Sequence, residues 1–165
     1  MPEIPEFDFE SILRTLADYE VDFIVVGGVA AVIDGAPINT FDLDIVHSRA
    51  PANVDRLLAA LESLDAWYRT HAATRLRPNQ SHLSSSGHNL LMTRYGPLDV
   101  LGRIGQSRAY EDLSPLTDQV QVDEGLRVRV LNLETLITIK EEVAGEKDLA
   151  VLPIMRRTLE EKRRR

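Results

Sequence analysis

In the first part of the chain, segments with the hydrophobic spacing of a helix alternate with segments that have the pattern of a strand. Apolar residues recur at helical spacing from Phe9 to Tyr19 and again after Pro51, so two amphipathic helices are predicted there. Residues 22–26 form a nearly continuous apolar run, which is typical of a strand buried on both faces. Apolar and acidic residues then alternate over 41–46, which predicts a half-exposed strand, and the short apolar stretch 29–33 between them predicts a buried helix.

The second part of the chain is harder to interpret at its start. Residues 74–87 are polar, contain Pro78 and show no period, so a loop is predicted there. The elements expected after it are two strands at 90–93 and 98–101 joined by a turn, a strand at 127–131, and helices at 133–144 and 147–162. This order predicts an α/β (α+β) fold, with a mixed sheet of about five strands flanked by helices. We expect a single domain over 1–165, with a core at about 22–131 and C-terminal helices at about 133–162.

Composition narrows the function classes. The 165 residues include 19 Lys+Arg and 26 Asp+Glu, which gives a net charge of −7, and they include no cysteine. Disulfide scaffolds and four-cysteine zinc sites are therefore excluded, and the surplus of carboxylates argues against extensive binding to a nucleic acid backbone. The acidic, proline-containing start lacks the order of a signal peptide, and no apolar run is long enough for a membrane span. We expect a cytoplasmic protein with no membrane partner.

Three aspartates carry the strongest chemical signal. Residues i and i+2 of a strand share a face, so Asp42 and Asp44 present two carboxylates side by side while Leu43 enters the core. Asp99 lies in a similar frame on another predicted strand. If the two strands pair, three carboxylates converge on a patch that suits one or two Mg²⁺ ions. The alternative is that the aspartates lie on the solvated face of an amphipathic sheet.

A glycine pair supplies the second signal. Gly27 and Gly28 end the buried strand and open a helix, which places backbone N–H groups where an anion can bind. They could equally form a tight turn. Together with the carboxylates they describe a phosphate-binding turn facing a metal patch, as phosphoryl or nucleotidyl transfer requires.

These residues resemble a known family. Residues 25–28, the Asp42-Leu43-Asp44 motif and residues 96–100 resemble the nucleotidyltransferases of the DNA polymerase β-like superfamily, in particular its small bacterial members. Those members include antibiotic-modifying, toxin and antitoxin proteins. A weaker similarity to toxin-type members covers 136–140 and 147–149, so the resemblance spans about residues 22 to 152.

The resemblance implies roles for the aspartates and the glycines. Asp42 and Asp44 would bind the Mg²⁺, or alternatively Mn²⁺, that bridges the nucleotide phosphates. Asp99 would bind a second metal ion and help to deprotonate the acceptor hydroxyl. Gly27 and Gly28 would let the triphosphate approach the backbone.

The resemblance also implies roles for residues outside these motifs. Lys140 would contact a phosphate, and Asp148 would contact the nucleotide or orient Lys140. Thr40 fits the family pattern Arg-x-Thr-x-Asp-x-Asp, but Ile38 stands where that pattern has Arg. The loss of this cation bears on phosphate affinity and on activity.

The function that follows is transfer of a nucleoside monophosphate from an NTP, such as ATP, to a hydroxyl group, with release of pyrophosphate. The acceptor would be a small molecule, a tRNA end or a protein. The alternative is a catalytically weak or inactive module that binds a nucleotide or a partner, such as a toxin–antitoxin component. A glycosyltransferase is disfavoured, because 165 residues leave little room for an acceptor subdomain.

Other polar residues are expected to have ordinary roles. The histidines lack the spacing of a helical metal pair, although His88 lies near the predicted hairpin. Ser84 to Ser86 are expected in a mobile loop, and Arg75 and Arg77 just before it either contact a phosphate or the acceptor, or are solvated. The basic residues at 162–165 are expected at a frayed helix end, with a contact to RNA or to an acidic partner as the alternative.

Overall fold

The computed structural model describes residues 7–142 and 146–165, and in the last helix it describes side chains from residue 149 onward. The helices are α1 (Phe9–Asp18), α2 (Gly27–Ile33), α3 (Pro51–Ser63), α4 (Gln80–Ser84), α5 (Tyr110–Leu113), α6 (Leu133–Glu142) and α7 (Glu146–Arg163), with short 3-10 turns at Arg69–His71 and Ser114–Leu116. The strands are β1 (Phe23–Val26), β2 (Leu43–His47), β3 (Trp67–Tyr68), β4 (His88–Thr93), β5 (Gly96–Leu101), β6 (Arg103–Ile104), β7 (Arg108–Ala109), β8 (Thr117–Asp123) and β9 (Leu126–Leu131).

One mixed sheet organises the described chain. Seven strands follow the order β3-β4-β5-β2-β1-β9-β8, and β6 and β7 form a separate hairpin. The pairs β2–β5 and β1–β9 are parallel, and the remaining pairs of the sheet are antiparallel. The interior strand β1 is buried along its whole length, as its apolar sequence predicts.

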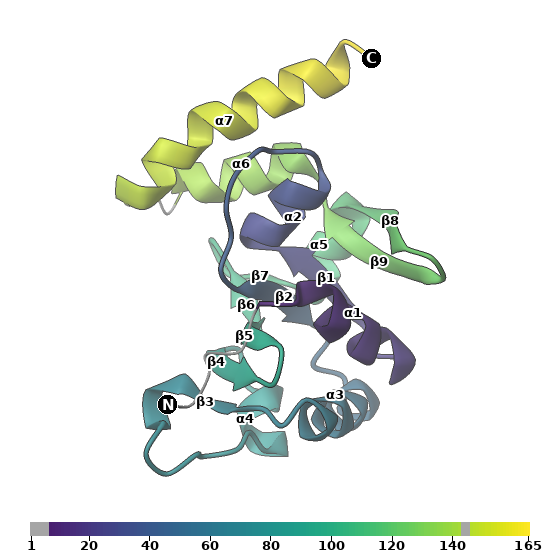
Figure 1. Ribbon diagram of the computed structural model, residues 1–165, viewed down its shortest axis with the longest axis vertical. Coiled ribbons are helices and arrows are strands. Elements are labelled where there is room, and N and C mark those ends of the chain that lie inside the picture. Colours follow the sequence, from purple (N-terminus) through teal and green to yellow (C-terminus); the bar gives the residue numbers. More distant parts are fainter. Residues whose placement is uncertain (1–6, 143–145) are drawn as a thin grey trace.

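Helices pack on the sheet by their apolar sides. In α1 the residues Ile12, Leu13 and Leu16 are fully buried, and the Asp8 side chain caps the helix by accepting a hydrogen bond from the Ser11 N–H at 3.1 Å. Figure 1 shows α7 lying across α6 at one end of the molecule, with α2 beneath them, and α3 with α4 at the opposite end. Because α2 begins directly after Val26, its N-terminal end lies at the end of the interior strand β1.

The predicted α/β class and mixed sheet are confirmed, but the sheet has seven strands rather than about five. The five predicted strands are β1, β2, β4, β5 and β9. The additional strands lie at the two edges: β3 is only two residues long, and β8 is largely exposed, so neither has a strong apolar pattern.

The predicted loop at 74–87 contains a short helix. The single-turn helix α4 lies within it, capped by the Asn79 side chain, which accepts from the His82 N–H at 2.9 Å. Leu83 anchors this turn because it is fully buried. No helix of the described residues is both long enough and apolar enough to cross a membrane.

Candidate active site

Strand pairing brings the three predicted aspartates together. Asp44 on β2 lies in register with Asp99 on the parallel strand β5, and with Val26 at the end of β1 on its other side. Asp42 directly precedes β2 and shares the face of Asp44. One carboxylate oxygen from each of the three aspartates lies within 4.8 Å of the others, so the three can bind a common metal ion.

Gly27 makes room for Asp44. It opens α2 with a φ of +67°, and a Cβ built on it would collide with Oδ2 of Asp44. Only glycine combines this left-handed backbone with so close an approach. The turn between β1 and α2 and the carboxylate of Asp44 are therefore in direct contact.

Gly28 makes a similar contact with Thr40. A Cβ on Gly28 would lie 2.9 Å from Oγ1 of Thr40, and that hydroxyl donates to the backbone carbonyl of Asp42 at 3.1 Å. Thr40 thus ties the segment that carries Asp42 to the start of α2. Ile38, which replaces the Arg of the family pattern, is partly buried and packs against the hydrophobic core.

The electrostatics of the site favour a bound cation. Burial, and then the negative charges of Asp42 and Asp99, raise the pKa of Asp44 to about 8, while Lys140 acts in the opposite direction. Oδ1 of Asp44 is buried, and among the described residues it has no hydrogen-bond partner. A divalent cation would satisfy this orphaned oxygen and remove the repulsion between the carboxylates.

A cavity of about 550 Å³ opens beside these residues. Its walls come from the ends of β1 and β5, the loop before β4, the β6–β7 hairpin and α6, and the residues are Val26, Gly27, Asp44, Ser86, His88, Leu101, Arg103, Ile104, Gly105, Ser107, Leu136, Ile139 and Lys140. The predicted residues Gly27, Asp44 and Lys140 therefore share one cavity. Its size is within the range typical of small-molecule sites.

An ion pair connects the β6–β7 hairpin to α6, and both of these elements line the cavity. Arg108 on β7 donates two hydrogen bonds to the carboxylate of Glu142 on α6, at 2.6 and 2.7 Å. A Cβ on Gly105 would lie 2.7 Å from Nη1 of Arg108, so the hairpin turn packs closely over this pair. The ion pair therefore fixes the hairpin to the helix that carries Lys140.

Arg69 is a site residue that the sequence did not reveal. Its Nη2 lies 2.7 Å from Oδ1 of Asp99, and its Nη1 donates to the backbone carbonyl of Leu91 at 2.5 Å. Arg69 follows β3, and the pairing of β3 with β4 is what brings it to Asp99, so local sequence patterns carry no signal for it. The sequence also did not predict Arg103 and Ser107 as cavity residues. They belong to the short β6–β7 hairpin, which has little apolar pattern.

Several other polar residues lie away from the carboxylates. The Asp148 side chain falls outside the described residues. Arg75 stacks on Trp67, with 5.0 Å between the guanidinium carbon and the ring centroid, and Arg77 pairs with Asp65. At the basic C-terminus, Lys162 pairs with Asp34.

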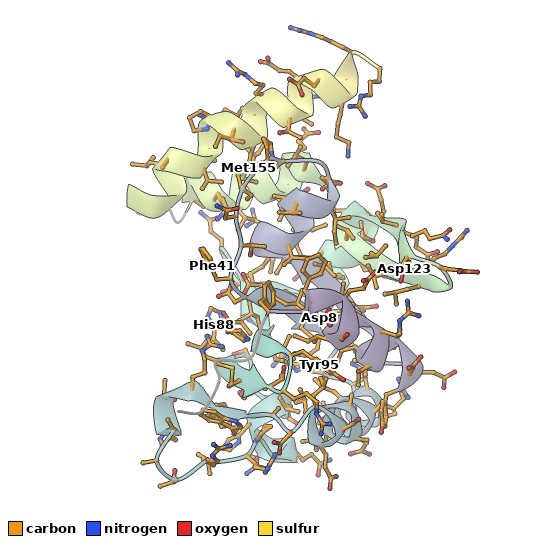
Figure 2. The ribbon with its side chains drawn as sticks, in the orientation of Figure 1. Asp8, Phe41, His88, Tyr95, Asp123 and Met155 are labelled. Atoms are coloured by element: carbon orange, nitrogen blue, oxygen red, sulfur yellow. The ribbon has the colours of Figure 1, made fainter. Side chains whose placement is uncertain are left out.

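The histidines and serines divide between structural positions and the cavity. His47 is buried, and its Nε2 lies 2.7 Å from the carbonyl oxygen of Leu83. Figure 2 shows His88 and Phe41 on the same side of the molecule, and His88 is also part of the cavity wall. Ser84 ends α4, so the serine run begins in a helix rather than in a loop, and Ser86 lies in the cavity wall.

Comparisons with solved structures identify the fold. A Thermotoga maritima protein assigned as a nucleotidyltransferase aligns with a TM-score of 0.57 and 16% identity, covering 93% of this chain and 91% of that protein. The lincomycin-bound lincosamide antibiotic adenylyltransferase LnuA aligns with a TM-score of 0.62 and 12% identity, covering 90% of this chain and 94% of that one. The antibiotic-resistance factor ANT(2'')-Ia, in complex with adenylyl-2''-tobramycin, aligns with a TM-score of 0.60 and 16% identity, covering 92% and 87%.

Sequence comparison alone does not find these relationships, since no protein-family model and no curated protein sequence match the chain. The structural matches agree with the nucleotidyltransferase resemblance of the motifs at 25–28, 42–44 and 96–100. The chain therefore has the fold of these nucleotidyltransferases.

Proposed function

We propose that the protein is a metal-dependent nucleotidyltransferase that moves a nucleoside monophosphate from an NTP to a hydroxyl group. The observation that carries the proposal is the cluster of Asp42, Asp44 and Asp99 beside the start of α2, in a chain with the nucleotidyltransferase fold. A carboxylate cluster alone has many explanations. The orphaned Oδ1 of Asp44 and the space kept open by Gly27 favour a site built for a cation and a phosphate.

The residues divide the chemistry between them. The acceptor oxygen forms a bond to the α-phosphorus as the bond from that phosphorus to the leaving pyrophosphate oxygen breaks, and the hydroxyl proton passes to Asp99. Asp42 and Asp44 would hold Mg²⁺ or Mn²⁺, and such a cation would supply positive charge that neutralises the phosphates. The N–H groups of Gly27 and Gly28 bind phosphate oxygens, and Lys140 adds a positive charge from α6.

A small molecule is the acceptor class to test first. Two structural neighbours are named for adenylyl transfer to antibiotics, and the cavity of about 550 Å³ is of the size that small molecules occupy. The net charge of −7 disfavours a long RNA footprint, so a tRNA end or a protein side chain is the second choice. A toxin–antitoxin partner and a cytoplasmic location stay predictions from the sequence.

The decisive experiment incubates the purified chain with Mg²⁺, each of the four α-labelled NTPs in turn, and a panel of hydroxyl-bearing acceptors that includes lincomycin and tobramycin. It measures transfer of the α-label to the acceptor together with release of pyrophosphate. We expect label transfer with one NTP, and a loss of at least about 100-fold in the Asp42→Asn and Asp44→Asn variants. Asp18→Asn, at an exposed position at the end of α1, is the matched control and keeps full activity.

Equal activity of wild type and both site variants would exclude the proposal. Tight NTP binding without pyrophosphate release, measured by calorimetry, would favour the alternative of an inactive nucleotide-binding module.

A further inference from the structure

We infer that the acceptor binds in a second pocket, one strand beyond Asp99, and that this pocket takes a hydroxylated ring with little or no positive charge. The inference rests on the proposed function and names the class of acceptor for it. The second pocket has a volume of about 330 Å³ and is lined by residues from the segments 68–76, 82–85 and 87–90.

The position of the second pocket is the first step. Strand β5, which carries Asp99, has β2 with Asp44 on one side and β4 on the other. Leu90 of β4 lies in register with Asp99, so the two side chains share one face of the sheet, and Leu90 lines the second pocket. His88 lines both the second pocket and the cavity of about 550 Å³. The second pocket therefore adjoins that cavity on the side of Asp99 away from Asp44.

The need for two substrates is the second step. The cavity of about 550 Å³ contains Gly27, Asp44 and Lys140, to which the proposed function assigns the nucleotide phosphates. An acceptor that gives its hydroxyl proton to Asp99 needs space on the other side of that residue. The second pocket supplies this space.

The walls of the second pocket are held by contacts within the chain. The Tyr68 hydroxyl donates to Oδ1 of Asn89 at 2.6 Å, and Nδ2 of Asn89 donates to the carbonyl oxygen of Val100 at 3.1 Å. The His82 ring meets the Tyr68 ring edge-on, with 5.3 Å between the centroids. The backbone N–H of Asn79 donates to Nδ1 of His82 at 3.2 Å. The pocket is thus formed before a ligand binds, as is usual for small-molecule sites.

The charge of the walls excludes one class of acceptor. None of the described residues that line the second pocket is Asp, Glu, Lys or Arg. Nδ1 of His82 accepts a hydrogen bond, which an imidazolium could not do. By contrast, the groove beside α3 is lined by Asp55, Glu62 and Asp65. A molecule with several ammonium groups would lose its hydration in the second pocket without gaining a carboxylate partner.

The hydrogen-bonding groups of the second pocket favour hydroxyls. Thr70 and Ser85 contribute hydroxyl groups to its lining. Strand β3 pairs only with Leu91 and Met92, so within the described chain no strand covers the outer edge of β4 at residues 88–90. Backbone N–H and C=O groups at such an edge can bind the hydroxyls of a ring, while Leu90 supplies an apolar contact. The volume suits one ring system rather than a long chain.

The test measures binding without NTP or metal. The probe of binding is the fluorescence of Trp67, which is the only tryptophan of the chain and directly precedes Tyr68. The two ligands are lincomycin, a hydroxylated ring compound with a single amine, and tobramycin, whose rings carry several amines. We expect the wild type to bind lincomycin at least about tenfold more tightly than tobramycin.

Variants of Thr70 locate the binding, because this residue lines the second pocket and is exposed. Thr70→Tyr fills the pocket and should weaken lincomycin binding at least about tenfold, with a higher KM for lincomycin and an unchanged KM for the NTP. Thr70→Glu adds the missing carboxylate and should strengthen tobramycin binding at least about fivefold, whereas Thr70→Gln should not. Gln121→Tyr and Gln121→Glu make the same changes at an exposed residue of β8, at the opposite edge of the sheet, and should alter neither affinity.

Each outcome decides the question. The inference is overturned if the wild type does not bind lincomycin, binds both ligands equally, or binds lincomycin no better than Thr70→Tyr does. None of these results affects the proposed function, which label transfer decides. Lincomycin binding that Thr70→Tyr abolishes, but without transfer from any NTP, would support the second pocket and count against the proposed function. If Thr70→Tyr does not fold, as judged by circular dichroism, the difference between Thr70→Glu and Thr70→Gln in tobramycin affinity still supports or overturns the inference.

Discussion

Asp44 and Asp99 lie side by side on two parallel strands, in exact register, with no residue between them. Like charges directly opposite each other destabilise a sheet, so two neighbouring carboxylates at its centre are unfavourable for folding alone. Burial adds to this penalty, as the raised pKa of Asp44 shows. The pair is therefore better explained by a binding function than by stability.

The first prediction concerns pH. Because the pKa of Asp44 rises from 3.8 to about 8 on folding, the folded chain holds a proton that the unfolded chain releases between these values. The stability of the metal-free protein should therefore fall as pH rises from about 4 to 8. Asp44→Asn removes this effect and should raise the free energy of unfolding at pH 8 by about 2 kcal/mol, or roughly 5 °C in Tm.

Thermal unfolding at pH 4.5 and pH 8, without divalent cations, checks this prediction. At pH 4.5 the Asn variant and the wild type should nearly coincide, and Asp18→Asn should show no such pH-dependent gain. An Asp44→Asn variant that is less stable than the wild type at pH 8 would contradict it. Cation binding should show the matching trend and strengthen with pH up to about 8, because the bound ion displaces the Asp44 proton.

The second prediction separates backbone strain from crowding at Gly27. Gly27 and Gly125 share nearly the same backbone, with φ of +67° and +69°, but a side chain on Gly125 would meet nothing within 4 Å. Alanine at either position should cost about 1–2 kcal/mol of stability from the left-handed conformation. Only Gly27→Ala should also displace Asp44 and abolish nucleotidyl transfer and cation binding.

Calorimetric unfolding and Mn²⁺ titration of the two variants measure these effects. Full cation binding by Gly27→Ala would show that the contact with Asp44 is not needed.

The third prediction concerns the ion pair that fastens the β6–β7 hairpin. The Arg108 and Glu142 side chains are 26% and 18% exposed and make two hydrogen bonds, whereas the neighbouring pair of Arg156 and Glu141 is about half exposed and makes one. A double-mutant cycle with Arg108→Met and Glu142→Gln should give a coupling energy at least twofold larger than the cycle at Arg156 and Glu141. Arg108→Met should also raise the KM for the nucleotide several-fold, since the cavity wall loses its attachment. Equal coupling in both cycles would indicate that the hairpin is held by other contacts.

The fourth prediction concerns Phe41, whose side chain is 74% exposed although it directly precedes Asp42. An exposed aromatic ring beside the site offers a stacking face to a nucleobase or to a ring of the acceptor. Phe41→Ala should leave Tm within about 1 °C, because little area is buried, and raise the KM of one substrate several-fold. The control is Leu116→Ala, at an exposed apolar residue outside the cavity wall. An unchanged KM for both substrates would rule out a stacking role.

The elements and residues that could be predicted from the sequence are those whose pattern depends only on residues close by in the chain. The helical period of α1 and the alternation around Asp42 and Asp44 depend only on near neighbours, so both could be predicted. Asp99 could be predicted only as a third strand aspartate, because its register with Asp44 depends on the parallel pairing of β2 and β5.

What the sequence did not reveal depends on contacts between distant segments. The ion pair of Arg69 and Asp99 joins residues 30 positions apart through the two-residue strand β3, which is too short to show a period. The edge strand β8 was not predicted because its exposed residues are mostly polar. Its strand conformation depends on its pairing with β9, which the local sequence does not indicate.

The parallel pairing of β2 with β5 also sets an order of events in folding. Parallel strands need a crossover, and here α3, β3, α4 and β4 all lie between the two strands in sequence. Asp44 therefore meets Asp99 only after this whole segment has closed, and such non-local contacts form late. A partly folded or partly synthesised chain therefore lacks the assembled cluster of Asp42, Asp44 and Asp99.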